Sequence, residues 1–221
     1  MSMPQRVAAT TKNSVFRLMA SDIGDKTHFE LYVNDALMMA TYFSALAEKL
    51  SLAALSGVPG RHGEILIGGL GLGLTLRHVL YNQAVHSVCV VELEPRVVDW
   101  NRTHLGNSDL LDDPRVELVL GDFCEYVQGT PRNYHGIVLH LDEGPDQVMR
   151  VENRRVYSLG MMQVLHARLR SGGTLAMRAR KPNPSFEKAL LNHFSMVEAV
   201  AVADQDPDGK SQMCVVYQAK A

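Results

Sequence analysis

The segment EILIGGLGLG, residues 64–73, determines how the rest of this chain is interpreted. It begins with a short apolar run, ends in closely spaced glycines and is followed by an apolar-periodic segment that starts at Leu74. This order predicts a buried strand, a tight turn and a helix. Glycine suits such a turn because the backbone there needs positive φ angles or passes close to a ligand. Free N–H groups at the start of the helix would then point towards a polar ligand in the adjacent crevice.

An acidic residue after the next apolar run supports a nucleoside as that ligand. Glu92 follows residues 87–91 and lies about 20 positions after the glycines, the usual spacing for a ribose-binding carboxylate. A carboxylate in this position can accept hydrogen bonds from both ribose hydroxyls. A plain strand-to-helix turn would explain the glycines alone, but the glycines and Glu92 together favour a nucleoside-binding site.

Composition and charge limit the classes to which the protein can belong. The 221 residues are 46% hydrophobic, enough for one large core, and the formal net charge is −2, which gives no footprint for nucleic acid. No apolar run is as long as a membrane span. The three cysteines form no CxxC pair, and the nine histidines show no metal-ligand spacing. We therefore expect a cytoplasmic protein that acts on a small molecule, without a nucleic-acid, membrane or metal partner.

The chain divides into three expected regions. Residues 1–13 are expected to form a flexible tail, 14–60 an N-terminal β-hairpin or meander with a linking helix, and 61–221 a Rossmann-like domain. Strands and helices alternate from residue 64, which is typical of a parallel sheet covered on both faces, and the last two runs predict an antiparallel hairpin. The expected strands are 14–19, 29–33, 36–39, 65–68, 88–92, 116–120, 136–141, 174–178, 197–203 and 212–218, and the expected helices are 41–55, 74–81, 95–103, 123–128, 153–169 and 185–194.

Ligands of an open parallel sheet bind beyond the carboxyl ends of its strands, so residues at these ends are the candidates for the site. The cofactor candidates are Gly68, Gly69, Gly71 and Gly73 after the first strand of the sheet, Glu92 and Leu93 after the second, and Asp122 and Phe123 after the third. Asp122 could accept a hydrogen bond from the exocyclic amine of a purine whose ring Phe123 flanks, or it could simply cap the next helix.

The end of the fourth strand carries the catalytic candidates. His140 could act as a general base near neutral pH, or it could be a satisfied structural residue. Asp142 and Glu143 could fix its tautomer or bind the substrate, and Glu143 could also be a solvated turn residue. Candidates for lining the acceptor pocket are Met38, Met39 and Tyr157.

Several short motifs together resemble the spermidine synthase-like branch of the class I S-adenosylmethionine-dependent methyltransferase fold. They are GGLG at 68–71, VELEP at 91–95, WNR at 100–102, DPRV at 113–116, GPD at 144–146, YS at 157–158 and GG at 172–173. The resemblance implies a Rossmann-like α/β fold with a mostly parallel seven-stranded sheet and a C-terminal antiparallel hairpin. It also implies that Glu92 holds the ribose, that Asp122 holds the adenine, and that the protein is a homodimer.

Two departures from the family pattern favour methyl transfer. Leu72 stands where spermidine synthases carry an Asp that holds the amine of the aminopropyl group, and His140 stands where they carry the catalytic Asp. Because an ammonium is costly to bury without a carboxylate, these changes argue against aminopropyl transfer to putrescine. We therefore expect a methyltransferase that uses S-adenosyl-L-methionine on a small-molecule acceptor. The alternatives are a polyamine aminopropyltransferase that uses decarboxylated S-adenosylmethionine, and a cofactor-binding module without catalysis.

Overall fold

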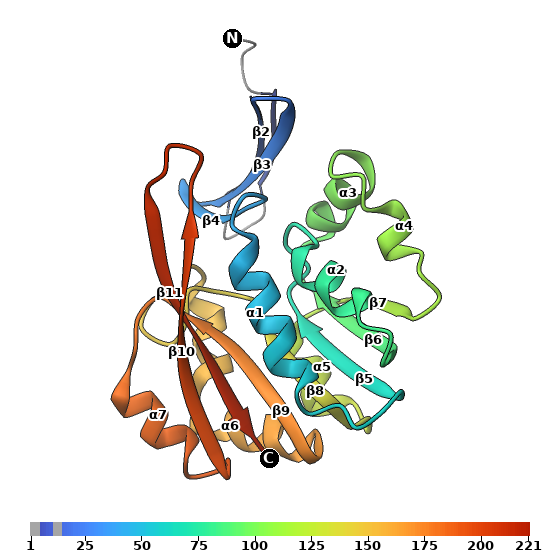
Figure 1. The fold of residues 1–221 in the computed structure, drawn as a ribbon, viewed down its shortest axis with the longest axis vertical. Coiled ribbons are helices and arrows are strands. Elements are labelled where there is room, and N and C mark those ends of the chain that lie inside the picture. The colour runs from blue at the N-terminus through green and yellow to red at the C-terminus, as the bar shows by residue number, and fades with distance from the viewer. Residues whose placement is uncertain (1–4, 11–14) are drawn as a thin grey trace.

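In the computed structural model, which describes residues 5–10 and 15–221, helix α1 (Ser44–Leu55) runs along a larger sheet, and a smaller N-terminal sheet lies beyond one end of this helix (Figure 1). Within these residues the larger sheet has seven strands in the order β10-β11-β9-β8-β5-β6-β7. They are β5 (Gly63–Gly68), β6 (Val85–Glu92), β7 (Val116–Leu120), β8 (Tyr134–Leu139), β9 (Leu169–Ala179), β10 (Met196–Gln205) and β11 (Ser211–Lys220). Strands β5 to β9 pair in parallel, whereas β11 is antiparallel to β9 and β10. The expected Rossmann-like α/β fold with a C-terminal hairpin is therefore confirmed.

The register of the central strands brings three chain segments to one place. Gly68 at the end of β5 pairs with Val91 of β6 on one side and with Leu139 of β8 on the other. The residues that come next in the chain after these two partners, Glu92 and His140, therefore flank the glycine loop. The strand order reverses at β5, and this is where open parallel sheets bind ligands.

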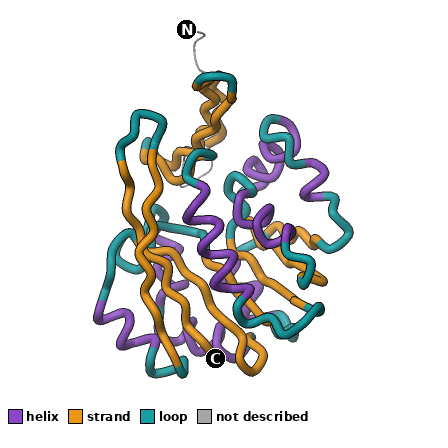
Figure 2. The backbone as a smooth tube through the Cα atoms, viewed as in Figure 1, coloured by secondary structure: helices purple, strands orange, loops and turns teal. Residues whose placement is uncertain are grey.

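Helices pack against the larger sheet, and Figure 2 shows helix α1 in front of its strands. The other helices of the described residues are α2 (Leu74–Tyr81), α3 (Pro95–Thr103), α4 (Ser108–Leu111), α5 (Phe123–Gly129), the 3₁₀-helix η1 (Val151–Tyr157), α6 (Leu159–Ala167) and α7 (Pro184–Leu190). Ile65 and Ile67 of β5 pack in the core cluster that includes residues of α1 and α2, whereas Leu66 packs in the cluster with α5 and α6. Burial on both faces explains why the central strands are continuous apolar runs.

The smaller, N-terminal sheet contains four described strands in sequential antiparallel order. They are β1 (Gln5–Thr10), β2 (Val15–Ile23), β3 (Lys26–Val33) and β4 (Ala36–Ala40). We expected residues 5–10 to belong to a flexible tail, but they form β1, and the whole length of β1 pairs with β2. This pairing satisfies backbone groups of β2 that would otherwise lie at an open edge. The remainder of the expected tail, residues 1–4 and 11–13, lies outside the described residues.

The expected helix at 153–169 is divided in the structure. Ser158 has an extended backbone between η1 and α6, and its hydroxyl accepts a hydrogen bond from the N–H of Met161. Serine is a preferred N-cap, so a new helix begins at Leu159.

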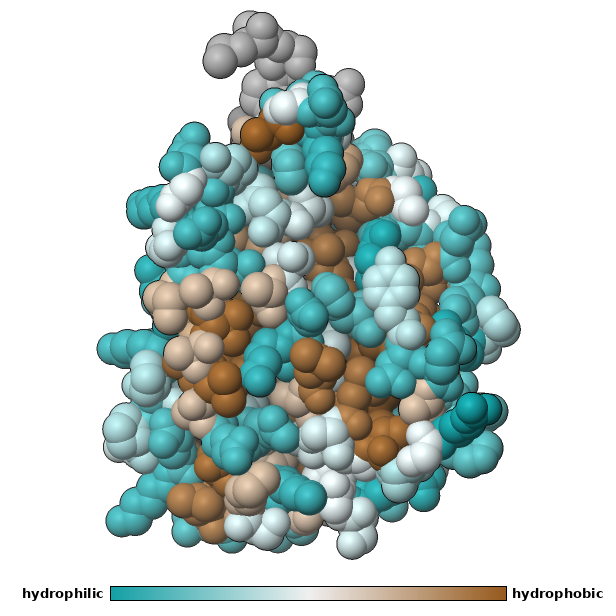
Figure 3. Space-filling model, viewed as in Figure 1, coloured by the Kyte–Doolittle hydropathy of each residue, from teal (hydrophilic) through white to brown (hydrophobic). Residues whose placement is uncertain are grey.

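In the described part of the chain, no helix combines the length and the apolar character needed to span a membrane. Figure 3 shows hydrophilic side chains around small apolar patches on the face viewed.

Gly136 of β8 tests the packing of α1 on the sheet. A Cβ at this position would lie 2.5 Å from the carbonyl oxygen of Ala54 near the end of α1. Gly136→Ala should therefore lower the free energy of unfolding by about 1–3 kcal/mol, measured by urea denaturation. Gly129→Ala is the control, because the space around Gly129 at the end of α5 is open. Equal loss of stability in both variants would contradict this account of the packing.

Candidate functional site

A cavity lies between the N-terminal sheet and the carboxyl ends of the central strands. Phe16, Leu31 and Val33 close it from the side of the N-terminal sheet. Of the residues predicted from sequence, it is lined by Gly69, Gly71, Glu92, Leu93, Asp122, Phe123, His140, Met38 and Met39. The structure therefore brings together candidates from the ends of β4, β5, β6, β7 and β8 around one space.

Glu92 connects the glycine loop to the end of β6. Its two carboxylate oxygens accept hydrogen bonds from the N–H groups of Leu70 and Glu94, both at 2.8 Å. Burial raises the pKa of Glu92, and the N–H groups that it accepts act in the opposite direction. Each carboxylate oxygen can accept more than one hydrogen bond, so Glu92 can still receive hydroxyl groups from the cavity.

The glycine loop passes between Met39 and the segment that follows β8. Gly69 and Gly71 have φ angles of +89° and +52°, which favour glycine. A Cβ at Gly69 would lie 2.7 Å from the carbonyl oxygen of His140, and a Cβ at Gly71 would overlap the Met39 sulfur. Backbone conformation favours glycine at both positions, and close packing against the His140 carbonyl also excludes a side chain at Gly69, whereas the Met39 side chain beside Gly71 can move.

Two buried asparagines hold this loop, and sequence analysis gave neither of them a role. Asn101 of α3 donates its side-chain N–H to the carbonyl of Gly71 at 2.8 Å. Asn107 donates to the carbonyl of Leu72 at 3.1 Å and to the side-chain oxygen of Asn101 at 2.7 Å. Asn101 belongs to the WNR motif, and its structural role becomes visible only from its buried position in α3.

The remaining cofactor candidates lie at the edges of the loop. Asp122 caps α5 by accepting from the N–H of Glu125 at 3.0 Å, and its other oxygen pairs with Arg155 at 2.5 Å. Both expectations for Asp122 are therefore compatible, since it caps a helix and lines the cavity. Gly68 ends β5 against the ring of Phe123, and Gly73 precedes α2 beside Asn107.

His140 is only 6% exposed and lies at the edge of the cavity. Its Nδ1 atom is 3.0 Å from the hydroxyl of Thr75, while its Nε2 atom has no hydrogen-bond partner in the described part of the chain. Burial, assisted by the charge of Arg178, lowers the pKa of His140 to about 3. The imidazole is thus neutral near pH 7 and can orient a substrate through Nε2, but it is a poor acceptor for a full proton.

The other catalytic candidates have different partners from those expected. Asp142 accepts hydrogen bonds from the N–H of Glu143 at 3.0 Å and from the side chain of Asn153 at 2.9 Å, and so holds the loop after β8. Glu143 forms a buried ion pair with Arg178 at 2.6 Å. The partner of His140 Nδ1 is Thr75, so neither carboxylate sets its tautomer through that atom.

Tyr157, expected to line the acceptor pocket, is not among the residues that line the cavity. Tyr157 packs against Phe186 in the second core cluster, with ring centroids 6.1 Å apart, and so belongs to the core beneath the site. Within residues 5–10 and 15–221, no group of three or more His, Cys, Asp or Glu side chains could hold a metal ion.

Comparison with known proteins identifies the family. The model of the spermine/spermidine synthase domain matches residues 47–203, which is more than half of the chain. The chain belongs to this family. Its relatives include "Polyamine aminopropyltransferase 2" of Pseudomonas aeruginosa, 32% identical over 149 residues that cover 62% of this chain and 41% of the relative. A protein of the same description from Hyperthermus butylicus is 30% identical over 124 residues, 55% of this chain and 40% of the relative.

Solved structures of spermidine synthases share the fold. One, in complex with the transition-state analogue AdoDATO, has a TM-score of 0.78 and 18% identity, and the match covers 97% of this chain and 72% of that chain. The enzyme from Thermotoga maritima has a TM-score of 0.74 and 17% identity, with the same coverage. The chain spans only about two fifths of the length of the two curated relatives.

The expectation of a methyltransferase that uses S-adenosyl-L-methionine is wrong. The matching family is that of spermine and spermidine synthases, and the matched relatives are polyamine aminopropyltransferases, which was our stated alternative. We gave too much weight to Leu72 and His140, which replace two carboxylates of the family pattern. A change at two positions can alter which acceptor binds while the scaffold that holds the nucleoside stays the same.

The buried, neutral state of His140 predicts how stability depends on pH. The unfolded chain binds a proton near the ordinary pKa of 6.5, whereas the folded chain does not until about pH 3. Folding therefore loses stability as pH falls between these values. From pH 7 to pH 5, wild type should lose about 2 kcal/mol more than His140→Gln, measured by urea denaturation.

The control for this experiment is His104→Gln, which replaces an exposed histidine just after α3. This variant should lose stability between pH 7 and pH 5 in parallel with wild type. If His140→Gln also follows wild type over that range, His140 is not held neutral by burial.

Proposed function

We propose that this chain is an aminopropyltransferase that transfers the aminopropyl group of decarboxylated S-adenosylmethionine to a small amine. One observation carries the proposal. The family match spans residues 47–203, and this range includes the glycine loop, Glu92, Asp122 and His140, which contribute to the cavity wall.

The cavity offers a suitable group for each part of the nucleoside. Glu92 accepts the ribose hydroxyls, Asp122 accepts from the exocyclic amine of adenine, and Phe123 lies beside the ring. The glycine loop runs between Glu92 and His140, so the sulfonium would lie over the loop with its reactive carbon towards the imidazole. The polar groups of the loop are already fixed by Asn101 and Asn107, which favours a site formed before the ligand arrives.

The reaction needs alignment more than acid–base chemistry. The lone pair of the acceptor nitrogen forms a bond to the carbon next to the sulfonium, and the C–S bond breaks. Its electron pair goes to sulfur, which gives 5′-methylthioadenosine, and the new ammonium releases its proton to water. His140 Nε2 can accept a hydrogen bond from the attacking amine, but its low pKa excludes it as the final proton acceptor. The acceptor must therefore arrive as a free amine.

We also propose that the protein acts as a homodimer in the cytoplasm. The three cysteines are buried free thiols, which suits a reducing compartment. Apolar side chains of the N-terminal sheet, Val15, Ile23 and Leu37, are exposed in the single chain, and a second copy could cover them.

The choice of sulfonium nucleoside tests the proposed function directly. Calorimetry should show that decarboxylated S-adenosylmethionine binds at least about tenfold more tightly than S-adenosylmethionine, because the family reaction uses no carboxylate at that end. Chromatography should then detect 5′-methylthioadenosine only when an amine is also present. Tighter binding of S-adenosylmethionine, or no product with any amine, would contradict the proposal.

A substitution at Glu92 tests the ribose contact. Glu92→Gln should weaken binding of 5′-methylthioadenosine by about 10- to 100-fold, the effect of losing charged hydrogen bonds in a buried site. Glu125→Gln, on the exposed side of α5, is the matched control and should bind like wild type. Circular dichroism of each variant confirms that the fold is retained. Wild-type affinity in Glu92→Gln would place the ribose elsewhere.

A further inference from the structure

A second, smaller cavity adjoins the first, and three residues line both of them. The shared residues are Met38, Met39 and His140. Its other lining residues include Phe43 and Leu46 at the start of α1, Arg178 of β9, and three residues of the C-terminal hairpin, Asp204, Gln212 and Cys214. The imidazole of His140 thus lies where a molecule in the second cavity could meet one in the first.

Two buried nitrogen atoms of this lining have no partner. Arg178 has a side chain that is only 6% exposed, with Nη2 bound to Glu143 and Nη1 donating to the carbonyl of Met38 at 3.3 Å. Within residues 5–10 and 15–221, neither the Nε atom of Arg178 nor the Nε2 atom of His140 has a hydrogen-bond partner. Buried polar atoms without a partner are rare in folded proteins, so two of them on one cavity call for a ligand.

The carboxylate of this lining is already in use. Both oxygens of Asp204 accept hydrogen bonds from the first N–H groups of α1, those of Ala45 and Leu46, at 3.1 and 3.0 Å. The positive end of the helix dipole also offsets the charge of Asp204. Glu143 is paired with Arg178 through Oε1, whereas its Oε2 has no hydrogen-bond partner among the described residues and lies 3.9 Å from Arg180. Glu143 does not line this cavity; of the charged side chains that do, Arg178 has the open atom, and its Nε is a donor.

Resting on the function proposed above, we propose that the second cavity binds the acceptor, and that this acceptor is a small amine with an oxygen group at its far end. The amine nitrogen lies at His140 Nε2, between the two cavities, and the oxygen accepts a hydrogen bond from Arg178 Nε. A carboxylate suits this position best, because hydrogen bonds between ionised groups are the strong ones. A second ammonium, which only donates, would leave Arg178 Nε without a partner and would be repelled by the guanidinium.

Three acceptors of equal chain length test this inference. They are 1,4-diaminobutane, 4-aminobutan-1-ol and 4-aminobutanoate, which differ in the charge and hydrogen bonding of the far end. Binding is measured by calorimetry on the wild-type protein saturated with 5′-methylthioadenosine, and transfer is measured from decarboxylated S-adenosylmethionine. We expect 4-aminobutanoate to bind about tenfold more tightly than the diamine, with the alcohol between them. Tighter binding of the diamine than of both others would overturn the inference.

A substitution at Arg178 assigns the preference to this side chain. Arg178→Gln removes the guanidinium, and the double variant Arg178→Gln/Glu143→Gln removes both buried charges, so that no unpaired carboxylate destabilises the fold. In the double variant the preference for 4-aminobutanoate over the diamine should fall by about tenfold. Arg180→Gln is the matched control, because Arg180 also faces Glu143 but is largely exposed and does not line this cavity. A preference that survives in the double variant would overturn the assignment.

The experiment separates failure of the inference from failure of the proposed function. If the oxygen-bearing amines bind better but none of the three reacts, the order of binding supports the acceptor cavity and the proposed transfer fails. If transfer occurs and the diamine is preferred, the function stands and the inference fails. If none of the three binds to the complex with 5′-methylthioadenosine, the second cavity is not the acceptor site.

Discussion

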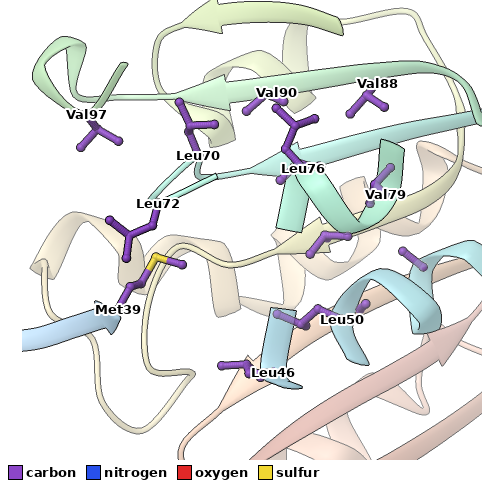
Figure 4. Packing of buried hydrophobic residues seen from close by; sticks show 14 of the residues in the cluster. Met39, Leu46, Leu50, Leu70, Leu72, Leu76, Val79, Val88, Val90 and Val97 are labelled. Atoms are coloured by element: carbon purple, nitrogen blue, oxygen red, sulfur yellow. The ribbon is translucent and has the colours of Figure 1, made fainter. Parts of the chain in front are cut away.

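The contact between Met39 and the glycine loop is the constraint on which both cavities depend. Figure 4 shows Met39, at the end of β4, pointing towards the loop that carries Leu70 and Leu72. The backbone of residue 71 has a φ of +52°, which favours glycine, and a Cβ there would meet the Met39 sulfur unless that side chain moved. The contact joins the N-terminal sheet to the loop at the ends of the central strands. It also makes Met39 part of the wall that separates the nucleoside cavity from the second cavity.

The two halves of the site differ in how far the protein satisfies its own polar groups. In the nucleoside half, Glu92 accepts two backbone N–H groups, and Asn101 and Asn107 bind the carbonyls of the glycine loop. In the acceptor half, His140 Nε2 and Arg178 Nε have no partner among the residues described. The protein therefore fixes the geometry of the proposed nucleoside half by itself, whereas the proposed acceptor half keeps open hydrogen-bonding atoms that a bound molecule could satisfy.

Local pattern was enough for most of the fold and for half of the site. The bounds of β7, α2 and α3 agree with those expected, and Glu92 ends β6 where the spacing places it, because each of these segments carries its own apolar pattern. The interactions that pattern could not give join distant parts of the chain. Thr75 reaches His140 across 65 positions, and Asp204 caps α1 across 158. Arg178 lies in an apolar strand, where its sequence neighbours give no sign of its partner, Glu143.

The error about the transferred group has a physical explanation. The replacement of two family carboxylates by Leu72 and His140 was interpreted as loss of amine chemistry, but Leu72 is buried in the core and lines neither cavity, and His140 lines both. The structure has a different set of charges there, with Arg178 and Glu143 buried together beside a neutral imidazole. A buried ion pair contributes little net stability after both charges lose their water. Under the proposed function, contact with a bound acceptor would explain the buried position of Arg178 better than stability does, and the departures from the family pattern would then reflect a different amine.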